Sequence, residues 1–207
     1  MVEGFALTSK KHKIGLLIAI EGIDQSGKQT QSRLLASRLL ERGYSVDVIA
    51  FPDYTTEIGR HLRKYLNGDT RSELHAVHML YAANKWESLP KLNQKIRSID
   101  VLILNRYRAS NLAYGVAHGL PLRWLSILED GLPEPDLVLV LDVSPRLSFE
   151  RKRNNRDLHE KEIDYLRKVR RVYLRLARRL RWIVINGDRD RKIVHSKIWR
   201  TVSPLLN

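Results

Sequence analysis

The stretch at residues 14–30 reads IGLLIAIEGIDQSGKQT and indicates the fold of the chain. Its apolar start predicts a buried strand, and residues 28–42 after it carry leucines at helical spacing. Between them stands Gly22-x-x-x-x-Gly27-Lys28, the spacing of a phosphate-binding loop. In such a loop, backbone N–H groups point at phosphate oxygens and the lysine reaches the β and γ positions. Strand, loop and helix in this order predict a nucleoside triphosphate site.

The helix after the loop has two features of interest. Leu34, Leu35, Leu39 and Leu40 are predicted to share one buried face. The residue after the loop lysine is Gln29, where the pattern has a Ser or Thr whose hydroxyl ligates Mg²⁺. The next hydroxyl along the helix points about 100° away. The pattern therefore predicts a phosphate cradle whose Mg²⁺ lacks its usual side-chain hydroxyl.

Five apolar, β-rich runs alternate with segments of helical spacing. This alternation predicts a parallel sheet covered by helices on both faces, with ligands beyond the carboxyl ends of the strands. The strands are expected at 14–20, 45–51, 101–105, 136–142 and 182–185. Further helices are expected at 57–66, 72–96, 109–118, 122–129, 145–153, 160–180 and 192–202. The polar run RKRNNRDLH at 151–159 predicts a short basic lid.

Composition restricts the class of protein. A chain of 207 residues predicts one α/β domain spanning 1–207. Cysteine is absent, which excludes disulfides, cysteine-zinc clusters and a thiol nucleophile. The sequence has no apolar run long enough for a membrane span and no apparent signal peptide, so a cytoplasmic protein without a membrane partner is expected. The arginine-rich, cysteine-free composition also favours a heat-adapted source.

The net charge of +14 favours polyanionic partners, which include nucleotides and nucleic acids. The helix expected at 160–180 carries the densest basic run. Its predicted buried stripe is Ile163, Leu166, Val169, Tyr173, Leu176 and Leu180. The basic residues outside it are Arg167, Lys168, Arg171, Arg175 and Arg178. A solvated basic face explains this pattern, so no specific nucleic-acid partner is expected.

Five segments resemble thymidylate kinases, a family of P-loop nucleoside monophosphate kinases, in their order and spacing. They are EGID at 21–24 with the loop that follows, FPDYTTEIG at 51–59, HMLYAANKWE at 78–87, NRY at 105–107 and GLPEPDL at 131–137. The resemblance implies a three-layer αβα P-loop NTPase fold with a five-stranded parallel sheet. It also implies transfer of the γ-phosphoryl group of ATP to dTMP, giving dTDP and ADP, with Mg²⁺. Homodimers packed through helices, such as those at 72–96 and 109–118, are typical of the family.

The resemblance assigns roles on the donor side. Phosphoryl transfer depends on positioning and on neutralising charge that spreads over oxygens. The residues implied to hold ATP are Gly22, Ile23, Asp24, Gln25, Ser26, Gly27, Lys28, Gln29 and Thr30, with Asn186 and Asp188 beside the adenine. The implied catalytic cations are Lys28, Arg106, Arg151, Arg153 and Arg156.

On the acceptor side, Arg106 is implied to grip the phosphate of dTMP with its fork of N–H donors. Asp24 would meet the 3′-hydroxyl, Tyr81 would stack on thymine, and Lys85 would donate to the base where the family has arginine. Stacking contributes roughly 1–3 kcal/mol. Phe51, Tyr54 and Tyr114 complete the implied site. The structural alternatives are a turn-stabilising Asp24 and a Tyr81 packed in the core.

Besides Lys85, three positions depart from the family pattern. Tyr54 stands where an arginine is usual, and Arg60 could substitute for the missing cation. Asn105 replaces an aspartate that organises Mg²⁺, so Gln29 and Asn105 are the candidate metal ligands, both neutral oxygen donors. Two alternatives to a thymidylate kinase therefore remain. One is a nucleotide-binding homologue with weak or no turnover, and the other is a kinase of dUMP or another deoxynucleotide.

Overall fold

Five parallel strands form the sheet that the sequence predicts, in the order β2-β3-β1-β4-β5. The computed structural model describes residues 15–151 and 163–206. The strands are β1 (Leu16–Glu21), β2 (Val46–Ala50), β3 (Val101–Asn105), β4 (Leu137–Asp142) and β5 (Ile183–Asn186). Each begins and ends within two residues of its predicted bounds, so the α/β fold is confirmed.

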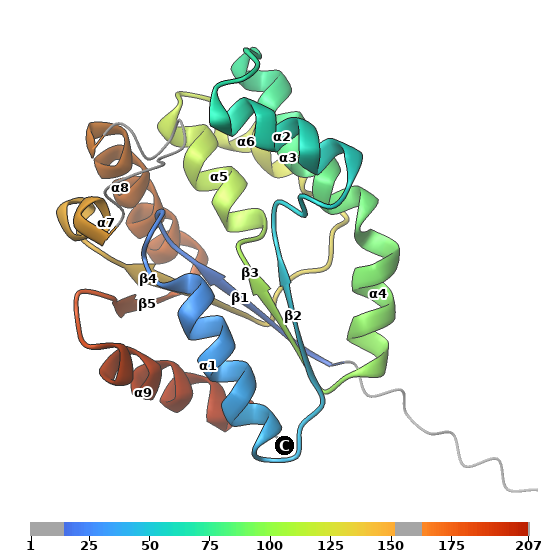
Figure 1. Ribbon diagram of the computed structural model, residues 1–207, viewed down its shortest axis with the longest axis vertical. Coiled ribbons are helices and arrows are strands. Elements are labelled where there is room, and N and C mark those ends of the chain that lie inside the picture. The colour runs from blue at the N-terminus through green and yellow to red at the C-terminus, as the bar shows by residue number, and fades with distance from the viewer. Residues whose placement is uncertain (1–14, 152–162, 207) are drawn as a thin grey trace, which may run out of the picture.

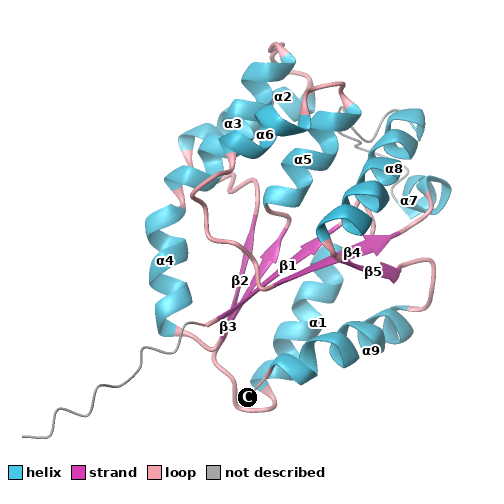
Figure 2. Cartoon of the chain, turned by 180° about the vertical axis from the view of Figure 1, so that it is seen from behind, coloured by secondary structure: helices cyan, strands magenta, loops and turns pink. Residues whose placement is uncertain are grey.

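Helices cover both faces of the sheet (Figures 1 and 2). They are α1 (Lys28–Leu40), α2 (Glu57–Asn67), α3 (Leu74–Glu87), α4 (Leu89–Ser98), α5 (Arg108–Ala117), α6 (Leu122–Leu128), α7 (Pro145–Arg151), α8 (Ile163–Leu180) and α9 (Arg191–Val202), followed by a short 3₁₀ turn at Ser203–Leu205. In Figure 1, α1 and α9 lie on one face, and α4, α5 and α8 lie on the other. Helices α2, α3 and α6 stand beyond the carboxyl ends of β2 and β3.

The central strand β1 is apolar up to its last residue, Glu21, because both of its faces are buried. Ile18 and Ile20 pack in one cluster with leucines of α1, whereas Leu17 and Ala19 pack in a second cluster that includes Leu92 of α4. A strand between two helical layers needs apolar side chains on every residue. This burial fixes the strand, and so fixes where the glycine loop after it begins.

Three expectations about helices were wrong. The helix predicted at 72–96 is two helices, because Pro90 lies in the first turn of α4, a position that proline tolerates at a helix start and not in an interior. Leu40 is 56% exposed and Leu180 is 45% exposed, although both were assigned to buried faces. Each is the last residue of its helix, where the chain leaves the core.

The basic residues assigned to the outer face of α8, from Arg167 to Arg178, are all exposed, as predicted. The predicted lid, apart from Arg151, lies outside the described residues, and so do Arg153 and Arg156. Within the described ranges, no helix is long and apolar enough to cross a membrane.

Candidate active site

The loop between β1 and α1 lines the larger of two adjoining cavities at the carboxyl ends of the strands. Gly22 has a φ of 139°, and a Cβ there would stand 2.6 Å from the carbonyl oxygen of Leu141, so the loop requires glycine at this position. Gly27 precedes α1 with a φ of 92°, and no side chain caps the helix. The first N–H groups of α1 therefore remain for an anion.

Lys28 lies inside the curve of this loop. Its Nζ donates hydrogen bonds to the carbonyl oxygens of Ile23 (2.7 Å) and Gly22 (3.2 Å). The predicted donor-loop residues that line the larger cavity are Asp24, Gln25, Ser26, Gly27, Lys28, Gln29 and Thr30. Gly22 and Ile23 are not among them: the glycine shapes the backbone, and the Ile23 side chain packs in the core.

Arg106 joins the two cavities and contacts the glycine loop. Its guanidinium pairs with Asp24 and donates to Ser110 Oγ (3.1 Å) and to the carbonyl of Gly22 (3.2 Å). It lies between β3 and α5, two residues before that helix begins at Arg108. Its φ is 64°, and its N–H donates to the carbonyl of Ile20. A non-glycine residue held in this conformation is typical of functional sites.

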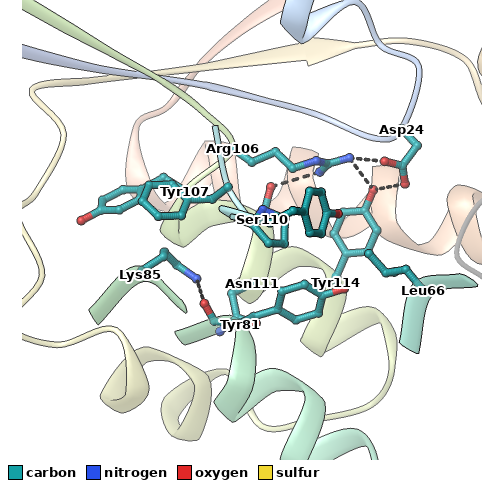
Figure 3. A pocket seen from close by; sticks show the side chains of 12 residues that line it. Asp24, Leu66, Tyr81, Lys85, Arg106, Tyr107, Ser110, Asn111 and Tyr114 are labelled. Carbon is teal, nitrogen blue, oxygen red and sulfur yellow. Dashed lines mark hydrogen bonds and ion pairs between the residues drawn. The ribbon is translucent and has the colours of Figure 1, made fainter. Parts of the chain in front are cut away.

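Asp24 receives a second hydrogen bond from Tyr114, whose hydroxyl donates to Oδ2 at 2.7 Å (Figure 3). Burial alone would lower the pKa of Arg106, but the surrounding groups, Asp24 first among them and Glu21 behind it, together outweigh burial and hold that pKa well above its ordinary value. Burial raises the pKa of Tyr114, because it disfavours the charged phenolate. Arg106 is therefore a permanent cation, and Tyr114 is a permanent hydrogen-bond donor beside it.

Glu21, the last residue of β1, is a residue that sequence reasoning missed. It is fully buried and accepts hydrogen bonds from the Tyr107 N–H (2.7 Å), Ser110 Oγ (2.6 Å) and the Tyr173 hydroxyl (3.1 Å). The signal was available, since an acidic residue that ends an apolar strand needs partners when it is buried. Glu21 fixes the start of α5 and with it the backbone next to Arg106.

The smaller cavity brings together the residues predicted to hold the acceptor. Its lining includes Asp24, Phe51, Tyr54, Tyr81, Lys85, Arg106 and Tyr114, together with Pro52, Leu66, Tyr107, Ser110 and Asn111, which were not predicted. Figure 3 shows Asp24, Arg106 and Tyr114 joined on one side of this cavity, with Lys85 on the opposite side. Flat aromatic walls between two cations suit a planar base that carries an anionic group.

Lys85 enters this cavity as half of a buried ion pair. Its Nζ stands 3.0 Å from Glu129 Oε1, and the two side chains are 4% and 0% exposed. The ammonium also donates to the carbonyl of Tyr81 at 2.7 Å. Glu129 follows α6 in a loop and carries no sequence signal for this role, so only the fold reveals it.

The cation that contacts Tyr54 is not the predicted Arg60, and neither Arg60 nor Arg63 lines the two main cavities. Arg60 is exposed and donates to the carbonyl of Thr55 (2.7 Å), because its helix turns it away from the cavity. Arg63, one turn further along α2, lies over the Tyr54 ring at 4.4 Å from its centroid.

At the far end of the larger cavity, the loop after β5 supplies Gly187, Arg189 and Arg191. Asn186 and Asp188 were predicted here, but neither lines the cavity. Their side chains instead hold the loop, because Asp188 accepts from the Ser144 N–H (2.9 Å) and Asn186 accepts from the Asp188 N–H (2.9 Å).

Arg151 spans the larger cavity from the end of α7. It donates to the carbonyl of Gln25 (3.0 Å) in the glycine loop and to that of Gly187 (3.3 Å) beyond β5. Of the three lid arginines predicted, it is the one in the described residues, and it lies at the cavity.

The candidate metal ligands Gln29 and Asn105 both line the larger cavity. Their amide oxygens are hard, neutral ligands that Mg²⁺ accepts. The described parts of the chain hold no group of three or more His, Cys, Asp or Glu residues that could bind a metal by itself. The donor set therefore fits a Mg²⁺ held chiefly by phosphate oxygens and water.

Comparison with known proteins agrees with this site. The thymidylate kinase family model matches residues 20–198. The thymidylate kinase of Schizosaccharomyces pombe is 35% identical over 198 residues, which cover 93% of this chain and 94% of that protein. The human thymidylate kinase is 33% identical over 186 residues, which cover 89% of this chain and 88% of the human protein. A solved structure of Candida albicans thymidylate kinase has a TM-score of 0.83 at 27% identity and covers 92% of each chain. The chain belongs to the thymidylate kinase family.

Proposed function

We propose that this chain transfers the γ-phosphoryl group of ATP to dTMP and releases dTDP and ADP. The observation that carries the proposal is the junction of two cavities, one lined by the glycine loop and one by aromatic side chains. Both cavities are lined by Asp24, Phe51, Pro52, Tyr54 and Arg106. A donor and an acceptor bound on either side of Arg106 would have their phosphates adjacent, and membership of the thymidylate kinase family supports this substrate pair.

The donor side supplies charge to the triphosphate. Lys28 and the N–H groups at the start of α1 would bind its phosphates. Arg151 would shift from its present carbonyl partners to the γ-phosphoryl group. In the transfer, an oxygen of the dTMP phosphate bonds to the γ-phosphorus while the bond to the leaving ADP oxygen breaks, and negative charge spreads over the oxygens between them.

The acceptor side fixes the attacking group. Arg106 would hold the dTMP phosphate in its fork of donors. Asp24 would accept from the sugar 3′-hydroxyl, with Tyr114 holding its second oxygen. Tyr81 would stack on the base, and Lys85 would donate to its edge. Because these groups are already fixed by buried contacts, little reorganisation is needed for the reacting atoms to meet.

The proposal is tested by dTDP formation from ATP and dTMP while the Mg²⁺ concentration is varied. When bound, Mg²⁺ would neutralise charge on the triphosphate, held on the protein side by Gln29 and Asn105. We expect wild-type turnover to rise up to millimolar Mg²⁺. Gln29→Thr, which restores a hydroxyl ligand, is expected to lower the half-saturating Mg²⁺ about tenfold, as expected for one contact of about 1.4 kcal/mol.

Thr30→Ala is the matched control for this titration. Its hydroxyl lies about 100° around the helix from the metal position, so its loss should leave the Mg²⁺ requirement unchanged. If the wild type forms no dTDP at any Mg²⁺ concentration and yet binds dTMP, the proposed activity is wrong and the chain is a binding homologue.

We further propose a homodimer that packs through α3, within the expected segment 72–96, and through α6. The helix expected at 109–118, α5, is instead mostly buried within the chain. Met79 and Trp86 lie seven residues apart on α3, hence on one face, and are 47% and 38% exposed; Ile127 of α6 is 63% exposed. Exposed large apolar residues gathered on neighbouring helices are typical of an interface. Sedimentation equilibrium is expected to give twice the chain mass, and Met79→Glu is expected to give monomers. A monomeric wild type at micromolar concentration would contradict this assembly.

A further inference from the structure

The ammonium of Lys85 has one hydrogen-bonding position to spare. Within the described part of the chain, Nζ has two partners, Glu129 Oε1 and the carbonyl of Tyr81. An ammonium has three N–H groups and no acceptor. One N–H is thus left for a group bound in the smaller cavity, and that group must be a hydrogen-bond acceptor.

Glu129, the partner of Lys85, is itself held by a buried polar chain, a series of hydrogen-bonded side chains. Asn111 Nδ2 donates to Glu129 Oε1 at 2.6 Å, and Asn111 Oδ1 lies 2.6 Å from His78 Nδ1. Because a carboxylate only accepts, the Asn111 amide must turn its NH₂ group toward Glu129 and its oxygen toward His78. His78 must then carry its proton on Nδ1.

The buried polar chain continues to His118, at the end of α5. His78 Nε2 lies 3.1 Å from His118 Nδ1, and the His118 ring stacks on Tyr165 with centroids 4.6 Å apart. With its proton on Nδ1, a neutral His78 accepts at Nε2, so His118 Nδ1–H is the donor. Hydrogen bonds are therefore donated in one direction, from His118 through His78 and Asn111 to Glu129. The Lys85 ammonium pairs with Glu129 at the end of this series.

Glu129 is the anionic group at which the buried polar chain ends. It does not line the smaller cavity, it is fully buried, and its Oε2 has no hydrogen-bond partner among the described residues. Oε1 forms an ion pair with the Lys85 ammonium and accepts a hydrogen bond from Asn111 Nδ2. A buried carboxylate with one free oxygen is costly unless a cation compensates it, and Lys85 is that cation.

We propose that Glu129 is a positioning residue that fixes Lys85 as a charged donor, and that this pair makes the enzyme select a pyrimidine with oxygen, rather than an amino group, at C4. The proposal rests on the proposed function. An ammonium can donate to a C4 carbonyl, whereas it meets an amino group donor to donor. A site built to hydrogen-bond one group rejects the analogue because buried polar groups are then left unpaired.

Glu129→Gln separates charge from shape, since the amide keeps an oxygen for Lys85 and Asn111 but removes the counter-charge. The probes are dTMP and dCMP, with kcat and KM measured at saturating ATP. We expect the KM for dTMP to rise about 10- to 100-fold, the value of a hydrogen bond to a charged group. The kcat and the KM for ATP stay near wild type, and the preference for dTMP over dCMP falls. Glu129→Asp, which keeps the charge, should recover part of that preference.

Lys85→Met provides the decisive background. If Glu129 acts through Lys85, Glu129→Gln adds little to the loss already caused by Lys85→Met, so the double variant is strongly non-additive. Leu125→Val, a fully buried substitution on α6 that leaves the polar chain intact, controls for lost stability. It should lower the melting temperature and leave the dTMP-to-dCMP ratio unchanged.

Two results would overturn the proposal: a Glu129→Gln variant that keeps the wild-type dTMP-to-dCMP ratio, or additive effects in the Lys85→Met background. Equilibrium binding of dTMP and dCMP gives the same comparison without turnover. A wild type that binds dTMP selectively but forms no dTDP would therefore contradict the proposed function and leave this inference to be decided by the binding ratio.

Discussion

Arg106→Ala is expected to lower kcat/KM for dTMP about 100- to 1,000-fold, because truncating one partner of a buried charge pair costs about 2–5 kcal/mol. The substitution removes the fork of donors for the acceptor phosphate and the cation paired with Asp24, whose Oδ2 keeps its hydrogen bond from the Tyr114 hydroxyl. We expect the largest change in the KM for dTMP. Steady-state kinetics with each substrate varied in turn measures it.

The same substitution should also lower stability, since Asp24 is only 16% exposed and loses its counter-charge. Combining Arg106→Ala with Asp24→Asn is expected to restore the melting temperature without restoring activity. Arg108→Ala is the matched control, because Arg108 pairs with Glu134 and does not line either main cavity. Equal losses from the Arg106 and Arg108 variants would show that Arg106 has no special place in the reaction.

Lys28→Ala is expected to lower kcat about 10²- to 10³-fold, the usual effect of removing one preorganised donor from developing charge. Its Nζ is 2.7 Å from a loop carbonyl and buried within the loop, so no neighbouring lysine of the described chain replaces it there. Binding of dTMP, measured by calorimetry, should be unchanged, because Lys28 does not line the acceptor cavity.

Lys91→Ala, on the exposed side of α4, serves as the control for general loss of positive charge. It should retain wild-type kcat. If Lys28→Ala kept a tenth or more of the wild-type kcat, the glycine loop would not be the donor site, and the placement of ATP would need revision.

The strands and the glycine loop could be predicted because their causes are local in the sequence. Buried strands need apolar residues on both faces, and Gly22 needs a conformation that other residues resist. The boundary between α3 and α4 depends on Pro90. This proline is visible in the sequence, but the prediction of one long helix followed the helical spacing of the apolar residues and gave the proline no weight. The exposure of Leu40 and Leu180 could not be read locally, because it depends on where each helix leaves the sheet.

The acceptor cavity was predicted from the family pattern, while the groups behind it were not. Lys85 is apparent in the sequence, but its counter-ion Glu129 lies 44 residues further along the chain and is brought there by the end of α6. Arg63 and Arg60 are equally basic in sequence, and only the rotation of α2 places one of them on Tyr54. A single domain, a cytoplasmic location, heat adaptation and the absence of a specific nucleic-acid partner stay predictions.

The pairing of Asp24 with Arg106 has a thermodynamic consequence. The two paired side chains line both the donor cavity and the acceptor cavity. A ligand that draws either side chain toward itself changes the energy with which the other is held. Binding of the two nucleotides is therefore linked, and whatever factor dTMP imposes on the Kd of ATP, ATP must impose on the Kd of dTMP.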